Sequence, residues 1–347
     1  MFNSTDIKYQ NRALEGVSRT FALTIPQLPS GLREVVGNAY LLCRIADTIE
    51  DEPALTHREK RKFSEQFINV VAGKGSAEQF ANLLHAQLSA STTSDERNLI
   101  RNTERVIRIT HTCTPAQQQA LERCVRIMSR GMADFQKRAS LSGLADISEL
   151  DHYCYYVAGV VGEMLTELFC DHCPDTAENH DQLIKLAVSF GQALQMTNIL
   201  KDVWDDQRRG VCWFPRDVFN EFGYELNNLS EDHRAKGYIS GMHKLVRITH
   251  GHQINALRYI QLVPVHQPGI RRHCIWALGM AVLTLKRIYD NPTFSSGSEV
   301  KISRFNVRSI ISDAESALNS NQALSDLFSR LSSGFPFYVE NQEAIIV

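Results

Sequence analysis

Two short acidic segments have the residue spacing that a magnesium site requires. In the first segment, DTIED, Asp47 and Asp51 lie four residues apart, and Asp202 and Asp206 have the same spacing in DVWDD. Side chains four apart on a helix lie about 5–6 Å from each other, so two carboxylates can share a cation. Magnesium prefers oxygen ligands and keeps substrate phosphates in its coordination shell. The spacing therefore predicts two carboxylate pairs that hold Mg²⁺ against phosphorylated substrates.

Each pair also extends a row of residues at helical spacing. The first row is Val36, Tyr40, Cys43, Asp47 and Asp51, and the second is Gly191, Gln195, Asn198, Asp202 and Asp206. One acidic pair at this spacing is more often an ordinary solvated helix surface. Two pairs that each continue an inward row, where an uncompensated carboxylate is costly, favour a function instead.

Cationic and aromatic residues accompany both pairs. Arginine presents a planar fork of donors that matches phosphate oxygens, and the candidate cations are Arg19, Arg44, Lys201, Arg208 and Arg209. Loss of diphosphate from an allylic substrate leaves a carbocation, which π faces attract and which must be kept from water. The candidate aromatic residues are Phe21, Tyr40, Tyr153, Tyr155 and Tyr156. Gly159 and Gly162 each cost a helix about 1 kcal/mol relative to alanine, so we expect close packing or pocket space there.

The elements that must carry these residues are helices. Apolar residues recur at steps of three and four nearly everywhere, and strict alternation over a strand length is hard to find. One helix is expected to begin near Leu32 and to end at the first acidic pair, and Ser94 or Asp95 is expected to cap another. We predict an all-α, single-domain helical bundle over residues 1–335, followed by a C-terminal tail over residues 336–347.

Composition restricts the class of protein. The chain has 347 residues, 43% of them hydrophobic, and a net charge of -2, which argues against a nucleic-acid partner. We find neither a signal peptide nor an apolar run of about 18–20 residues, so we expect a cytoplasmic protein without a membrane span, and peripheral membrane contact stays open. Cys170 and Cys173 form a lone CxxC among eight cysteines, which leaves a zinc-binding module as a minor alternative.

Four segments together resemble the squalene/phytoene synthase family in order and spacing. They are SRTF (18–21), YLLCRIADTIED (40–51), YCYYVAGVVG (153–162) and GQALQMTNILKDVWDDQRRGVCWFP (191–215). The resemblance extends from about Ser18 to at least Arg304, and within the family it is strongest to the squalene synthases. It implies an all-helical isoprenoid-synthase fold with a central active-site cavity.

The resemblance also implies roles for individual residues. The four aspartates of the acidic pairs match the family's magnesium ligands, and Gln195 and Asn198 match its polar cavity face. Arg19 and Arg44 match its diphosphate-binding arginines, and Lys201, Arg208 and Arg209 are the further candidates. Tyr153 matches the tyrosine of the first half-reaction, Phe21 a phenylalanine that stabilises cations, and Lys301 and Arg304 a basic stretch proposed to hold NADPH.

The implied activity is the head-to-head condensation of two farnesyl diphosphate molecules to presqualene diphosphate, followed by NADPH-dependent conversion to squalene. NADPH rests on the resemblance alone, since the sequence has no GxGxxG after a strand. We expect a monomer. The main alternative is a non-reducing synthase that stops at presqualene diphosphate, dehydrosqualene or phytoene. A terpene cyclase is less favoured, because it would show a DDxxD-type motif, whereas this chain has DTIED and DVWDD. A relative without catalysis is also less favoured, because it would have lost some of the four aspartates, and all four are present.

Overall fold

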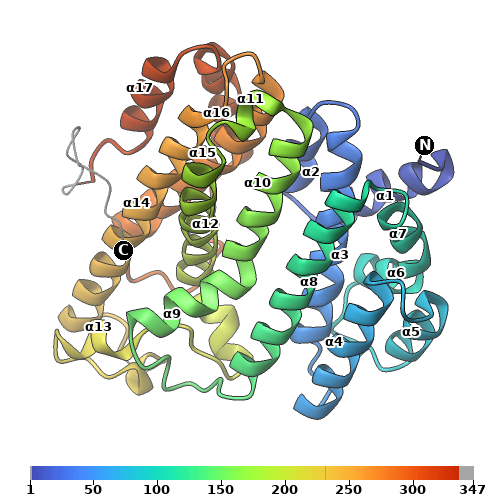
Figure 1. The fold of residues 1–347 in the computed structure, drawn as a ribbon. Coiled ribbons are helices and arrows are strands. Elements are labelled where there is room, and N and C mark those ends of the chain that lie inside the picture. Colours follow the sequence, from blue (N-terminus) through green and yellow to red (C-terminus); the bar gives the residue numbers. More distant parts are fainter. Residues whose placement is uncertain (1, 231, 336–347) are drawn as a thin grey trace. The chain divides into compact units, whose positions relative to one another are not determined.

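The computed structural model describes residues 2–230 and 232–335, which form helices joined by loops (Figure 1). Within this part of the chain, the only β-type pairing is an isolated bridge between Leu144 and Pro215. The all-α fold class is therefore confirmed, and the expected tail over 336–347 lies outside the described residues. The chain divides into two compact units. Unit 1 comprises Met1–Lys137 and Glu163–His180, and unit 2 comprises Arg138–Gly162 and Asp181–Val347.

Unit 1 is organised around α3, whose residues Leu41, Leu42 and Ile45 are completely buried. Helix α3 packs against α1, α7 and α8. The elements of the unit are α1 (Ser4–Val17), α2 (Phe21–Thr24), η1 (Ile25–Gln27), α3 (Leu32–Asp51), α4 (His57–Val71), α5 (Ala77–His85), α6 (Ser94–Arg101), α7 (Thr103–Thr110), α8 (Pro115–Gln136), most of α10 (Val160–His172) and α11 (Pro174–Ala177). The bounds of α3 confirm the helix that was expected from Leu32 to the first acidic pair.

The N-cap of α6 differs by one residue from the expectation. Thr93, rather than Ser94 or Asp95, accepts a hydrogen bond from the Glu96 backbone N–H, at 3.3 Å. The Glu96 carboxylate in turn accepts one from the Thr93 backbone N–H, at 3.0 Å. This reciprocal capping box satisfies two otherwise free N–H groups, which explains why the helix begins after Thr93.

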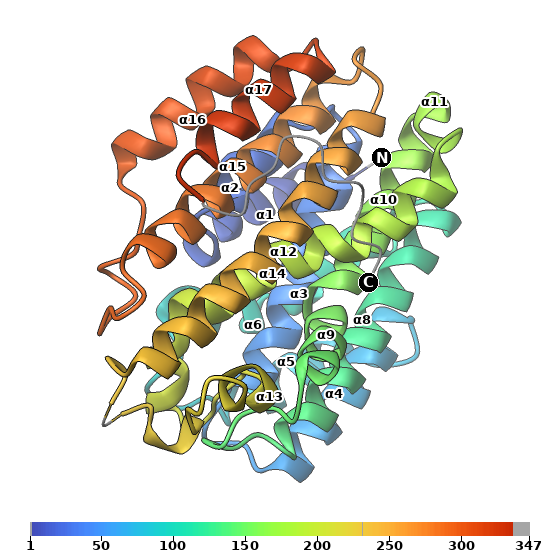
Figure 2. The same ribbon diagram turned by 90° about the vertical axis from the view of Figure 1, so that its left-hand side faces the viewer.

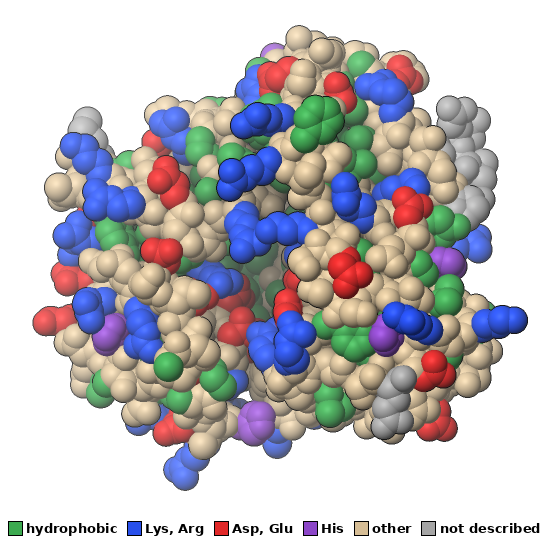
Figure 3. All heavy atoms as spheres, turned by 180° about the vertical axis from the view of Figure 1, so that it is seen from behind, with side chains coloured by type: hydrophobic (Ala, Val, Ile, Leu, Met, Phe, Trp, Pro, Cys, Tyr) green, Lys and Arg blue, Asp and Glu red, His purple; other side chains and the backbone are tan. Residues whose placement is uncertain are grey.

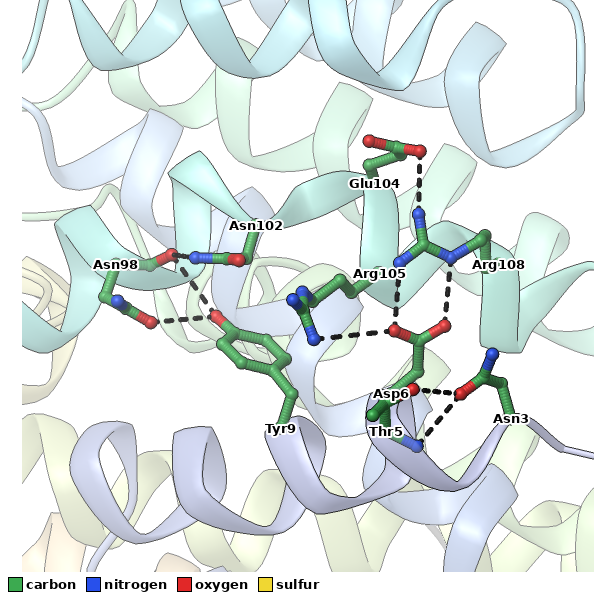
Figure 4. A network of polar contacts seen from close by, with 9 residues as sticks. All are labelled: Asn3, Thr5, Asp6, Tyr9, Asn98, Asn102, Glu104, Arg105 and Arg108. Carbon is green, nitrogen blue, oxygen red and sulfur yellow. Dashed lines mark hydrogen bonds and ion pairs between the residues drawn. The ribbon is translucent and has the colours of Figure 1, made fainter.

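An ion pair between the buried Asp6 carboxylate and the exposed Arg108 side chain joins α1 to α7 (Figure 4). Asp6 is 2% exposed, and Arg108 donates to both of its carboxylate oxygens at 2.9 Å. Arg105 adds a second cation 3.7 Å away. The hydrogen bonds from Arg108 lower the pKa of Asp6 below its ordinary value. Segment 18–21, which contains Arg19 and Phe21, follows α1 directly. The ion pair therefore also helps to position this segment.

Unit 2 contains two long antiparallel helices, α14 and α15, which lie side by side, with α16 and α17 packed on α15 (Figure 2). Its elements are α9 (Ile147–Cys154), the π-helical turn η2 (Tyr155–Gly159), α12 (His180–Arg208), α13 (Arg216–Asn220), η3 (Leu226–Asn228), α14 (Lys236–Leu262), α15 (Pro268–Asp290), α16 (Arg304–Ala317) and α17 (Asn321–Leu331). Ring contact between Phe190 and Tyr259, at 5.6 Å, joins α12 to α14.

Two glycines allow the backbone around η2 to touch the backbone of α12. A Cβ atom on Gly191 would lie 2.3 Å from the Ala158 carbonyl oxygen, and one on Gly162 would lie 2.3 Å from the Ala187 carbonyl oxygen. Real Cβ atoms do not approach a backbone oxygen so closely, so only glycine fits. The close packing expected at Gly162 is confirmed. Gly191 faces this contact, so the polar row predicted on α12 does not begin there.

Buried histidines on α14 give the fold a pH dependence. His252 Nδ1 lies 2.8 Å from Ser189 Oγ on α12, and His250 Nδ1 lies 3.2 Å from Gln253 Oε1. Burial lowers the pKa of both histidines to about 4. The unfolded chain takes up these protons near pH 6.5, whereas the folded chain does so only near pH 4.

We therefore expect the free energy of unfolding to decrease as the pH falls from about 6.5 to about 4. Each histidine contributes up to about 1.4 kcal/mol per pH unit within that window. Urea denaturation of the protein and of His252→Asn at pH 7, 6, 5 and 4.5 measures the effect. The variant should show the smaller slope, and equal slopes would contradict the assignment to His252.

The surface carries charges of both signs. Lys and Arg side chains are interspersed with Asp and Glu on the face that Figure 3 shows. Among the described residues, none of the helices combines the length and the apolar character needed to cross a membrane.

Candidate active site

The last turns of α3 carry the first acidic pair. Asp47 is partly buried, and Asp51, the last residue of the helix, is exposed. Burial raises the pKa of Asp47 to about 7, Arg44 opposes this shift, and the charges of Asp51 and Glu96 add to it. A carboxylate disfavoured both by burial and by neighbouring carboxylates is one that a divalent cation would stabilise. The donor set on α3 therefore fits Mg²⁺.

A third carboxyl group, that of Glu50, belongs to the same turn, and the sequence analysis did not select it as a site residue. It is 9% exposed, and Gln136 Nε2 on α8 donates to its Oε1 at 3.0 Å. Burial, together with the charge of Asp51, raises the pKa of Glu50 to about 8. A search for acidic pairs four residues apart passes over Glu50, and its partner on α8 is 86 residues away along the chain.

Arg44 lies one turn before Asp47 and is already paired. Its guanidinium forms an ion pair with Glu96, the residue that completes the N-terminal capping box of α6. Its Nε is buried and has no hydrogen-bond partner within the described part of the chain. Glu96 thus orients the Arg44 guanidinium, and the unused Nε–H leaves it one donor for an anion.

Aromatic residues lie near Arg44. The rings of Phe21 and Tyr40 lie 5.4 Å apart at 43°, and the Tyr40 hydroxyl donates to the Val17 carbonyl oxygen at 3.2 Å. Burial raises the pKa of Tyr40, and the charge of Arg44 acts against that shift. Arg19 is exposed in the link between α1 and α2. Unit 1 therefore brings Phe21 next to α3, one helical turn before Arg44.

The second acidic pair lies in the last turns of α12. Lys201 Nζ lies 3.2 Å from an Asp202 carboxylate oxygen and donates to Asn198 Oδ1 at 3.2 Å. Asp206 is 5% exposed and pairs with Arg209. Burial raises the pKa of Asp202, and Lys201 opposes this shift. The predicted residues thus lie close together on the last turns of α12. Asn198 is exposed, whereas Asp206 is buried.

The remaining members of the predicted set on α12 are placed as follows. Gln195 is partly buried, and Arg208 is exposed and pairs with Asp205, a carboxylate outside the predicted set. Each of the three predicted cations, Lys201, Arg208 and Arg209, therefore already has a carboxylate partner on α12.

Tyr153 is held by an aromatic partner that the sequence analysis did not select. It lies on α9, is 5% exposed, and stacks on Trp213 with ring centroids 4.0 Å apart at 12°. The π-helical turn begins at Tyr155, two residues later. Such widened turns are frequent at functional sites. Trp213 lies within segment 191–215, one of the four segments that resemble the family. That resemblance was the only indication in the sequence that Trp213 belongs to the site.

Lys301 and Arg304 lie at the start of α16. Both are exposed, Ser303 between them caps the helix, and Arg304 is its first residue. Neither belongs to an ion pair in the described residues. Two exposed cations of this kind fit phosphate groups of a cofactor.

Over residues 2–230 and 232–335, no three His, Cys, Asp or Glu side chains form a group that could hold a metal ion unaided. Each acidic pair would therefore share its Mg²⁺ with water and substrate phosphate oxygens, which is how this ion is usually bound. Cys170 is partly buried and Cys173 is buried. Neither cysteine belongs to a metal-holding cluster of His, Cys, Asp and Glu within residues 2–230 and 232–335.

Comparisons with known proteins give a consistent result. The sequence model of the squalene/phytoene synthase family matches residues 14–306. The chain is 29% identical to the squalene synthase ERG9 of Candida albicans over 289 residues, which is 81% of this chain and 61% of that protein. It thus spans about three fifths of the length of this curated relative.

Solved structures share the fold. The complex of TcSQS with the ligand BPH1237 has a TM-score of 0.76 and 23% identity, covering 94% of this chain and 90% of that one. A dehydrosqualene synthase in complex with a ligand has a TM-score of 0.66 and 21% identity, covering 90% of this chain and 96% of that one. The all-helical fold of these synthases is therefore that of this chain.

Proposed function

Because the chain belongs to the squalene/phytoene synthase family, we propose that it joins two farnesyl diphosphate molecules head to head and reduces the product to squalene. The observation that carries this proposal is the pair Asp47 and Asp51 beside Arg44, on a helix end where burial and repulsion favour a cation. The similarity to the curated squalene synthase of Candida albicans supports the choice of substrate and product.

We assign the metal to the two acidic pairs, Asp47 with Asp51 and Asp202 with Asp206. Mg²⁺, when bound, neutralises diphosphate and makes it a better leaving group. In its absence, Lys201 pairs with Asp202 and Arg209 pairs with Asp206. When a cation compensates the carboxylates, Lys201 and Arg209 become available to diphosphate oxygens, together with Arg19, Arg44 and Arg208. Gln195 and Asn198 add polar contacts.

The proposed first half-reaction uses the aromatic residues. The C1–O bond of one farnesyl diphosphate breaks and leaves an allylic cation. A double bond of the second molecule attacks that cation, and loss of a proton closes the cyclopropane of presqualene diphosphate. Tyr153, held flat against Trp213, is assigned to this proton transfer near the departing diphosphate. The face of Phe21 stabilises the cation.

The proposed second half-reaction consumes presqualene diphosphate. Its C–O bond breaks and diphosphate departs, the cyclopropylcarbinyl cation rearranges, and addition of hydride opens the cyclopropane ring to give linear squalene. NADPH, when bound, supplies that hydride, and Lys301 and Arg304 would bind its phosphates. We further propose that the protein acts as a cytoplasmic monomer in peripheral contact with a membrane, into which the hydrocarbon product can pass.

Product analysis tests the proposal. Purified protein is incubated with farnesyl diphosphate and Mg²⁺, with and without NADPH, and the lipid extract is examined by mass spectrometry. We expect squalene only with NADPH. Presqualene diphosphate or dehydrosqualene regardless of NADPH would establish the non-reducing alternative, and phytoene from geranylgeranyl diphosphate alone would replace the substrate assignment.

Replacing Lys301 with alanine should separate the two half-reactions. We expect Lys301→Ala to form presqualene diphosphate at the normal rate and to form squalene about tenfold more slowly at subsaturating NADPH, because a charge-assisted phosphate contact is lost. Arg308→Ala, which removes another exposed cation from α16, is the matched control. Equal slowing of both half-reactions in Lys301→Ala would contradict a cofactor role.

A further inference from the structure

The segment that joins α15 to α16 runs against the metal-binding turn of α12 within unit 2. A Cβ atom on Gly297 would lie 2.9 Å from the Lys201 carbonyl oxygen and 3.5 Å from Asp202 Oδ1. The backbone φ of Gly297 lies outside the left-handed region. Glycine is therefore required here by lack of space and not by backbone conformation.

Trp204, two residues after Asp202, anchors the same segment. Its indole Nε1–H donates to the Phe294 carbonyl oxygen at 2.7 Å, and both side chains are buried, Trp204 at 9% and Phe294 at 0% exposure. The ring of Trp204 also meets His233 edge to face, at 4.9 Å. This hydrogen bond holds both the indole ring and the loop in place, because a buried N–H or carbonyl group without a hydrogen-bond partner destabilises the fold.

Hydrogen bonds within the segment limit its freedom further. The Ser295 backbone N–H donates to Glu299 Oε1 at 3.0 Å, and the hydroxyls of Ser296 and Ser298 lie 2.9 Å apart. These contacts close a compact turn around Gly297. The turn thus lies beside Asp202 Oδ1, and Lys201 lies beside the other carboxylate oxygen.

We propose that residues 294–299 form a positioning element for the Asp202 carboxylate, with Trp204 and Gly297 as its two positioning residues. Trp204 ties the segment to α12, and Gly297 lets its backbone reach the carboxylate side chain. The element holds the side chain of Asp202 in one orientation before a cation arrives. This inference rests on the proposed function, because it takes Asp202 as a ligand of Mg²⁺. Mutation of a residue that orients a metal ligand typically lowers metal affinity by about 10–100-fold.

Binding of Mn²⁺, a spectroscopic substitute for Mg²⁺, tests the element without turnover. Free Mn²⁺ is measured by electron paramagnetic resonance while it is titrated into the full chain with inorganic diphosphate present. We expect Gly297→Ala to weaken Mn²⁺ binding about tenfold, because its methyl group displaces the segment or Asp202. We expect Trp204→Phe, which keeps a ring but removes the Nε1–H donor, to weaken it at least threefold.

Gly237→Ala is the matched control for packing damage. Its Cβ would lie 2.6 Å from the Phe222 carbonyl oxygen, so it should lower the thermal unfolding temperature at least as much as Gly297→Ala while leaving Mn²⁺ binding unchanged. Asp202→Asn provides the reference for loss of the ligand itself.

Three results are informative in different ways. Weaker binding in Gly297→Ala and Trp204→Phe, with normal binding in Gly237→Ala, supports the element. If Asp202→Asn loses binding while Gly297→Ala and Trp204→Phe bind as the unchanged protein does, this inference is overturned and the proposed function stands. If the unchanged protein and Asp202→Asn bind Mn²⁺ equally, both the metal assignment and this inference fail.

Discussion

Asp47→Asn and Asp202→Asn are each expected to lower kcat/KM for presqualene diphosphate formation by at least about 100-fold. That loss corresponds to roughly 2.7 kcal/mol of transition-state stabilisation, a modest share of what a metal ion supplies to a departing diphosphate. Asparagine keeps the size of the side chain but removes the charge that an oxygen-liganded cation requires. The measurement is the steady-state rate with farnesyl diphosphate over a range of Mg²⁺ concentrations.

Asp205→Asn is the control on the same helix. Asp205 lies between the two assigned ligands of α12, is exposed, and pairs with Arg208. It should retain nearly normal activity, because a surface pair of this kind contributes little. Extra Mg²⁺ should recover part of the activity of Asp47→Asn and Asp202→Asn. Near-normal turnover in both variants at low Mg²⁺ would remove the metal assignment.

Gly191→Ala is expected to show the second large effect, on stability as well as on rate. The new Cβ would lie 2.3 Å from the Ala158 carbonyl oxygen, so α12 and the π-helical turn must separate. Overpacking of this kind costs about 3 kcal/mol, and here it acts on rigid backbone. Since Tyr153 lies just before that turn, we also expect presqualene diphosphate formation to slow about tenfold.

Gly16→Ala is the comparison for Gly191→Ala. A Cβ on Gly16 would meet the Asp95 side chain at 2.7 Å, and that exposed side chain can turn away. Its helix propensity improves by about 1 kcal/mol, so urea denaturation should show little change or a small gain. Equal stability of Gly191→Ala and the unchanged protein would show that α12 and the turn are not in backbone contact.

Properties that depend on neighbours along the chain were predicted well. The step of three and four residues from Val36 to Asp51 predicted α3 and its end, because helical geometry fixes which residues share a face. The position of the α6 cap was wrong by one residue, since the Thr93–Glu96 capping box competes with the nearby Ser94 and Asp95.

The polar row on α12 shows the limit of such reasoning. Spacing placed Gly191 in one row with Asp202, but Gly191 is used for backbone contact with Ala158. Periodicity gives the direction of a residue from its helix axis, and it does not say what lies in that direction. The functions assigned to the four aspartates, to Tyr153 and to Lys301 remain predictions that the experiments above can test.

The sequence by itself determined the helical fold class, the ends of α3 and the spacing of the two acidic pairs, because these follow from local backbone geometry. Only the tertiary structure decided which distant groups act on them. Glu96 pairs with Arg44 from 52 residues away, Gln136 donates to Glu50 from 86 residues away, and Gly297 lies beside Asp202. Such partners are chosen by how helices pack, and burial there, rather than residue type, raises the pKa of Asp47 and Glu50.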